Sequence, residues 1–115
     1  MVIHIVPNDK GNPPGKLADV ELHFTDGPLA GLKLVGFGIW ERRGGGERNV
    51  TFPARAFSVN GERRSFALLR PLTSTDGMTS PLRDAILDAY DAHEEQEAQR
   101  AALDLSAIGA QIGGL

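Results

Sequence analysis

The hydrophobic pattern of this chain changes its period once, close to Ser80. Before that point, residues 17–24 alternate between apolar and polar side chains, which is typical of a strand with one buried face. After it, apolar residues recur at the spacing of a helix face, and Ser80-Pro81 supplies an N-cap and a first helical residue. Because strands come first and the helix last, the sequence predicts an α+β fold: a small antiparallel β-sheet of about four strands, followed by a C-terminal α-helix.

Turn residues divide the chain before Ser80 into segments of strand length. These segments are 1–6, 17–24, 32–40, 49–52 and 62–69. Residues 54–61 are predicted to form a loop that ends in Asn60-Gly61, a pair typical of the type I′ turn of a β-hairpin. In the segment after that turn, alternation places four side chains on one face: Arg64, Phe66, Leu68 and Arg70.

Gly36 and Gly38 stand two residues apart in the apolar segment 32–40, so both fall on one face of a strand. Two interpretations are open. A β-bulge or twist accounts for the pair within the chain, or the missing side chains admit another layer, either a helix or a partner chain. The segment is also apolar on both faces, and a single helix covers only one of them. We therefore expect a homodimer.

The composition excludes several classes of protein. The chain contains no cysteine, so a disulfide framework, thiol catalysis and zinc held by cysteine are ruled out. No apolar run approaches the roughly 18 residues of a membrane-spanning helix, and the N-terminus lacks the pattern of a secretory signal. With 115 residues, we expect one domain of a cytoplasmic protein that has no membrane contact.

Charge is distributed unevenly along the chain. Residues 15–83 hold ten Lys and Arg against seven Asp and Glu, a net charge of +3. Residues 84–115 hold one Arg against seven acids, a net charge of -6. The total of -3 argues against a strongly basic protein that binds any nucleic acid. The acidic stretch is either a solvated helix face or a region that limits which anions the basic body holds.

The sequence offers no catalytic or metal-binding constellation. His4, His23 and His93 lie far apart, and none has a second ligand at a spacing typical of zinc. Gly44-Gly45-Gly46 lacks the Lys-Ser/Thr that completes a phosphate loop. The aspartates of the predicted helix share a face, but a helix alone rarely supplies enough oxygens for a hard cation. We therefore predict a non-enzymatic protein with no cofactor and no metal.

Basic side chains gather instead around two predicted loops and at the helix start. Guanidinium groups suit phosphate oxygens because their donors match a bidentate geometry. Trp40 and Phe52 are candidate flat faces for bases, as in single-strand binders built on sheets. In the other interpretation, the arginines solubilise the loops and the aromatic residues belong to the core. The candidate nucleic-acid contacts are Arg42, Arg43, Arg48, Arg55, Arg63, Arg64 and Arg83.

Three pieces of the chain resemble one bacterial family. Ala18-Asp19-Val20-Glu21-Leu22 is similar to its opening strand. Residues 50–55, followed by Gly61-Glu62-Arg63-Arg64, look like its strand that ends in proline and the Gly-Glu turn after it. Residues 82–90, LRDAILDAY, are similar to its helix. Over residues 17–93 the chain thus resembles the stage V sporulation protein G (SpoVG) family, although Ala54 stands where serine is usual.

The resemblance implies a small β-sheet packed by a C-terminal helix, a homodimer, and binding of DNA or RNA in the cytoplasm. It divides the chain into an N-terminal short strand and Pro/Gly loop (1–16), a single SpoVG-like domain (17–97) and a C-terminal tail or helix extension (98–115). We expect the last segment to be mobile, or to order only against a partner chain.

The predicted function is that of a bacterial regulator that binds DNA or RNA through hairpin loops bearing arginine. The alternative is a protein-interaction or assembly module. Such a module would use the sheet edge and the acidic helix, without nucleic acid.

Overall fold

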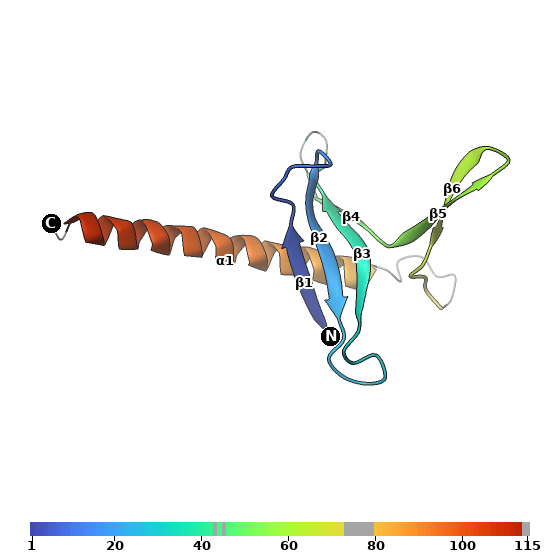
Figure 1. Ribbon diagram of the computed structural model, residues 1–115, viewed down its shortest axis with the longest axis horizontal. Coiled ribbons are helices and arrows are strands. Elements are labelled where there is room, and N and C mark those ends of the chain that lie inside the picture. The colour runs from blue at the N-terminus through green and yellow to red at the C-terminus, as the bar shows by residue number, and fades with distance from the viewer. Residues whose placement is uncertain (43, 45, 73–79, 114–115) are drawn as a thin grey trace.

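Six strands precede one long helix in the computed structural model, which describes residues 1–42, 44, 46–72 and 80–113. The predicted α+β class, with its antiparallel sheet and C-terminal helix, is confirmed (Figure 1). The elements are β1 (Val2–Pro7), β2 (Lys16–His23), β3 (Lys33–Trp40), β4 (Asn49–Thr51), β5 (Ala54–Val59), β6 (Glu62–Ala67) and α1 (Ser80–Gly113).

The first four strands form an antiparallel sheet in the order β1-β2-β3-β4, so each strand pairs with its neighbour along the chain. The register places apolar residues side by side on one face. Val20 of β2 pairs with Ile5 of β1 and with Phe37 of β3. Ala18, Val20 and Leu22 are all buried. The alternation in the sequence therefore predicted the core face of β2 correctly.

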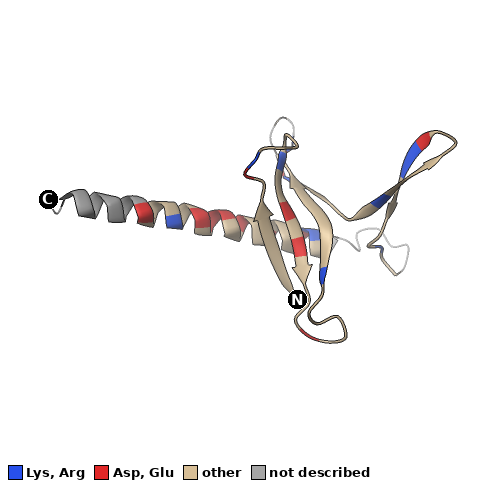
Figure 2. Ribbon diagram, in the orientation of Figure 1, with Lys and Arg blue, Asp and Glu red and all other residues tan. Residues whose placement is uncertain are grey.

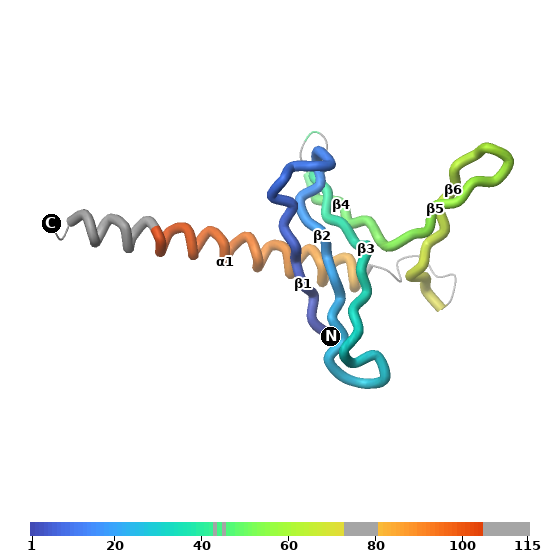
Figure 3. The backbone as a smooth tube through the Cα atoms, in the orientation of Figure 1, coloured from blue at the N-terminus to red at the C-terminus, as the bar shows by residue number. Residues whose placement is uncertain are grey.

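The helix α1 covers that core face and contacts both β1 and β4. Ile86 and Tyr90 lie one helical turn apart and are buried, beside the half-buried Leu82. Beyond His93, the side chains from Glu94 to Asp104 are exposed, and the helix runs on past the sheet (Figure 1, Figure 3). We refer to residues 94–113 as the helix overhang.

The chain itself fills the space beside Gly36 and Gly38. Gly36 lies at a β-bulge between β2 and β3, with a φ of 110° that glycine adopts readily. A Cβ at this position would lie 2.9 Å from the Cβ of Pro53. At Gly38, a Cβ would lie 2.8 Å from Nε1 of Trp40. The bulge interpretation is confirmed at Gly36. Because residues of the same chain fill the space beside both glycines, neither glycine requires a partner chain.

Residues 54–59 were predicted to form a loop, and this prediction is wrong, because they form β5. This strand pairs with β6 in a separate hairpin of two strands. Asn60 and Gly61 connect the strands with φ values of 52° and 80°, as a type I′ turn requires, so the predicted turn is confirmed. Every residue of β5 and β6 is exposed. We refer to residues 54–70 as the hairpin arm, which projects from the sheet on the side away from the helix overhang (Figure 1).

Candidate nucleic-acid interface

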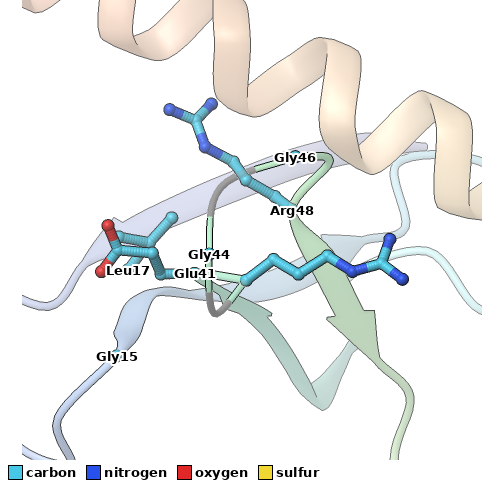
Figure 4. Close-up of a pocket in the computed structure, with 7 residues that line it drawn as sticks. Gly15, Leu17, Glu41, Gly44, Gly46 and Arg48 are labelled. Carbon is cyan, nitrogen blue, oxygen red and sulfur yellow. The ribbon is translucent and has the colours of Figure 1, made fainter.

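The guanidinium group of Arg48 is held by the helix. Its Nη1 lies 3.0 Å from Oδ1 of Asp91 and 2.7 Å from Oε1 of Glu94. Its guanidinium carbon lies 4.8 Å from the centroid of the Tyr90 ring, which is a cation–π distance. Figure 4 shows this side chain extending from the connection before β4 toward α1. Arg48 therefore ties the β3–β4 connection to the helix, and two carboxylates already compensate its charge.

Arg83 reaches the same connection from the helix. Its Nη2 donates to the backbone carbonyl of Arg48 at 3.4 Å and lies 3.8 Å from Oε2 of Glu47. Its Nη1 lies 4.0 Å from Oδ1 of Asp84. The structure thus brings two of the predicted contacts together, but among acidic groups. A phosphate would have to compete with those groups for either arginine.

Arg42 is exposed just after β3. It lines an open concavity of about 550 Å³ together with Glu41 and Arg48, and the latter two are labelled in Figure 4. The carboxylate of Glu41 weakens the attraction of this hollow for a phosphate. Arg43 lies outside the described residues, so its predicted contact stays a prediction. Both described arginines of this connection therefore have acidic neighbours: Arg48 pairs with Asp91 and Glu94, and Arg42 lines the same concavity as Glu41.

The hairpin arm places arginine and phenylalanine opposite each other. Arg55 pairs with Phe66, and Phe57 pairs with Arg64. Directly paired residues of antiparallel strands share a face, so the two cations and the two rings alternate on one surface. Arg63 lies on the opposite face, among small side chains. We refer to the first surface as the Arg–Phe face, made of Arg55, Phe57, Val59, Glu62, Arg64 and Phe66.

Both rings of the Arg–Phe face are accessible, since Phe57 is 40% and Phe66 is 48% exposed. The guanidinium carbon of Arg70 lies 4.8 Å from the centroid of the Phe66 ring. On the same face, Nη2 of Arg64 lies 3.4 Å from Oε2 of Glu62. An isolated hairpin of two strands has no core in which to bury such rings. Their exposure beside cations makes this face the candidate surface for contact with another molecule.

The aromatic residues favoured from the sequence have other surroundings. Trp40 is half-buried and donates its Nε1–H to a threonine hydroxyl of β4 at 3.0 Å. Phe52 is half-buried, and its ring centroid lies 5.3 Å from that of Phe37 in an edge-to-face arrangement. Phe52 thus belongs to the core, as expected from the interpretation in which the aromatic residues are core residues and not stacking surfaces for bases. Sequence reasoning missed Phe57, although its alternation with Arg55 is a readable signal once residues 54–59 are taken as a strand.

Charge separates the two projections of the molecule. The hairpin arm contains four arginines and one glutamate, a net charge of +3. Residues 94–104 of the helix overhang contain four acids and one arginine, a net charge of -3. Figure 2 shows these charges on opposite sides of the sheet. An approaching polyanion is therefore attracted to the arm and repelled by the overhang.

His4 and His23, far apart in the sequence, are neighbours on the face of the sheet that α1 does not cover. Their ring centroids lie 4.9 Å apart, and Nε2 of His23 lies 2.9 Å from Oε1 of Glu21.

Within the described ranges, no group of three or more His, Asp or Glu side chains is arranged to hold a metal ion. In the same part of the chain, no helix combines the length and the apolar character that crossing a membrane requires.

Comparison of the chain with protein-family models, with curated proteins and with solved structures gives no match. The resemblance to the SpoVG family over residues 17–93 therefore stays a prediction. The candidate interface is defined by the chain's own side chains, and its centre is the Arg–Phe face of the hairpin arm.

Proposed function

We propose that this chain is a non-enzymatic regulator that binds DNA or RNA through its hairpin arm. The observation that supports the proposal is the cross-strand alternation of arginine and phenylalanine on the exposed Arg–Phe face. Guanidinium groups bind phosphate oxygens with paired donors, and aromatic rings stack on bases. One projecting hairpin therefore carries groups for both parts of a nucleotide.

The predicted arginines have different roles in this proposal. Arg55 and Arg64 contact phosphates from the Arg–Phe face, and Arg63 adds charge on the opposite face of the arm. Arg42 is a secondary phosphate contact at the β3–β4 connection. Arg48 and Arg83 act indirectly, because their ion pairs and hydrogen bond hold the helix against that connection.

We also propose that the chain acts in the cytoplasm as a homodimer, as the SpoVG resemblance implies. Val2 and Val6 of β1 are exposed, and β1 lies at one edge of the sheet in the described strand order. An exposed edge strand with apolar side chains is a ready surface for a second chain. Light scattering at high micromolar concentration is expected to give twice the chain mass of 12.3 kDa. The chain mass itself would contradict the dimer.

The binding test uses fluorescence anisotropy of labelled DNA and RNA over a series of salt concentrations. Each phosphate contact contributes about 0.7 to the slope of log K against log salt for a single strand, and about 0.9 for a duplex. The Arg55→Gln/Arg64→Gln variant is therefore expected to lower the slope by about 1.4 to 1.8. Lys10→Gln/Arg100→Gln is the matched control, because it removes the same charge outside the arm and is expected to keep the slope.

Two results would contradict the proposal. One is the absence of binding by the wild-type chain at low salt with tens of micromolar protein. The other is an equal effect of the arm variant and its control, since the arm would then have no special part in binding.

A second observation favours the alternative, a protein-interaction or assembly module. The helix overhang exposes acidic side chains together with the apolar Leu103, a combination that suits a basic partner protein. This module needs no nucleic acid, so the absence of nucleic-acid binding in the salt series would favour it.

A further inference from the structure

We infer that the hairpin arm selects single-stranded over duplex nucleic acid by stacking unpaired bases on Phe57 and Phe66. This inference rests on the proposed function and names the class of its ligand. A duplex offers phosphates and the edges of its bases, whereas a single strand also offers the flat faces of its bases. The Arg–Phe face pairs one ring with each of its two arginines, so it matches a ligand in which phosphates and base faces are both accessible.

The spacing of the two rings suits bases that are separated from each other. Phe57 and Phe66 belong to neighbouring cross-strand pairs on one face, and such diagonal neighbours lie about 7–8 Å apart. Successive bases in a duplex strand lie only about 3.4 Å apart along the axis. Two rings at roughly twice that spacing match bases drawn apart. An unpaired strand supplies such bases without breaking base pairs.

Each ring also has a cation beside it. Phe57 is opposite Arg64, and Phe66 is opposite Arg55. The guanidinium of Arg70 lies over the Phe66 ring at 4.8 Å. A strand laid across the hairpin can therefore place its phosphates on the guanidinium groups and its bases on the rings. The ion pair of Arg64 with Glu62 is exposed, so it is weak enough for a phosphate to replace the carboxylate.

The tip of the hairpin is poorly suited to the groove of a duplex. A ribbon of two strands can enter the major groove when its side chains reach the base edges. Here the last pair before the turn is Val59 with Glu62, one apolar and one acidic side chain. An acid at the leading end would approach the phosphates on both sides of the groove. The cations lie farther from the tip, where a strand crossing the hairpin meets them.

The test compares four ligands of one length and one mixed sequence: single-stranded DNA, single-stranded RNA, and the two corresponding duplexes. Binding to the full chain is measured by anisotropy. At least one single strand is expected to bind about tenfold more tightly than its duplex. The Phe57→Ala/Phe66→Ala variant is expected to lose about tenfold per ring in that affinity. Its salt slope should stay unchanged because its arginines remain.

Two further variants separate stacking from apolar contact and from folding. Val59→Ala removes an apolar side chain of the same face that has no ring, and it is expected to change the affinity less than about twofold. Phe57→Leu/Phe66→Leu keeps apolar area without a ring, and it is expected to lose affinity like the alanine variant. Circular dichroism is expected to show one melting temperature for all variants, because the altered side chains are exposed.

The outcomes distinguish this inference from the proposed function. Equal binding of single strand and duplex, or full single-strand affinity in the Phe57→Ala/Phe66→Ala variant, overturns the inference. Salt-sensitive binding that depends on Arg55 and Arg64 leaves the proposed function standing in either case. If the wild-type chain binds none of the four ligands, both the inference and the proposed function fail.

Discussion

The guanidinium group of Arg48 lies 4.8 Å from the ring of Tyr90, a helix residue that is only 8% exposed. This contact joins the connection before β4 to the C-terminal end of the buried helix face. Burial raises the pKa of the Tyr90 phenol above its ordinary value, and the neighbouring Glu94 raises it further. The ring therefore stays neutral at physiological pH and offers its face to the cation.

The first prediction concerns this junction. Arg48→Ala is expected to lower the free energy of unfolding by about 1–2 kcal/mol, because it removes two partly exposed ion pairs and a cation–π contact. Arg42→Ala, on the same connection, is expected to change it by less than about 0.5 kcal/mol. Urea denaturation followed by circular dichroism measures both values. Equal changes in the free energy of unfolding for the two variants would show that the contacts of Arg48 with the helix do not stabilise the fold.

The second prediction uses Trp40, the one tryptophan of the chain. Gly38→Ala places a Cβ 2.8 Å from Nε1 of Trp40, so the indole must move away and lose its hydrogen bond to Thr51. We expect a shift of tryptophan emission to longer wavelength and a loss of about 1–3 kcal/mol of stability. Val35→Ala is the control, because Val35 lies in the same strand as Gly38 and its side chain is exposed. The control is expected to leave the emission unchanged. A shift in the control would contradict the attribution of the emission change to displacement of Trp40 by a Cβ at position 38.

A third prediction compares two apolar positions of α1. Ile86 is fully buried against the sheet, whereas Leu103 is exposed on the helix overhang. Ile86→Ala is expected to reduce the free energy of unfolding by about 2–5 kcal/mol. Leu103→Ala is expected to change it by less than about 0.5 kcal/mol. A large loss with Leu103→Ala would mean that the overhang is packed in solution, as it would be against a second chain.

The fourth prediction is a dependence on pH. The hydrogen bond with His23, followed by that with Lys33, lowers the pKa of the Glu21 carboxyl below its ordinary value. Because the folded pKa is lower than the unfolded one, the carboxylate stabilises the fold above the unfolded pKa. This contribution is lost as the pH falls through the folded pKa. It is therefore complete at neutral pH and disappears in the acid range.

The variant Glu21→Gln tests that sign, because its amide does not titrate. Urea denaturation is compared for both proteins between about pH 6 and about pH 3, a range that spans the titration of a glutamate. The wild-type chain is expected to lose stability more steeply toward acid pH than the variant. Parallel curves would show that Glu21 has the same pKa in the folded and unfolded states.

The sequence predicted best those elements whose side chains meet the core. Ala18, Val20 and Leu22 alternate because β2 has one buried face, and Ile86 and Tyr90 repeat because α1 buries one stripe. Burial itself creates these periods, so they can be read without a structure. The Asn60-Gly61 turn was equally readable, because it depends on local backbone preferences.

Other features depend on contacts that local patterns do not contain. β5 was missed because neither of its faces is buried, so it lacks the contrast by which a strand is recognised. The role of Arg48 depends on Asp91 and Glu94, which lie more than forty positions later in the chain. The approach of His4 to His23 follows from the register of β1 against β2. The Arg–Phe face could not be predicted from the sequence for the same reason, because the pairing of β5 with β6 brings its arginines and phenylalanines together.

The two projections also determine how the molecule moves through solution. Its longest axis extends 70 Å, and its radius of gyration is 18.8 Å, whereas a compact chain of this length has about 13 Å. An elongated particle has more friction than a sphere of equal mass. In gel filtration a single chain is therefore expected to elute early, close to a compact dimer, and its tumbling is expected to be anisotropic. Sedimentation or scattering, which report mass separately from friction, are the methods that can count its chains.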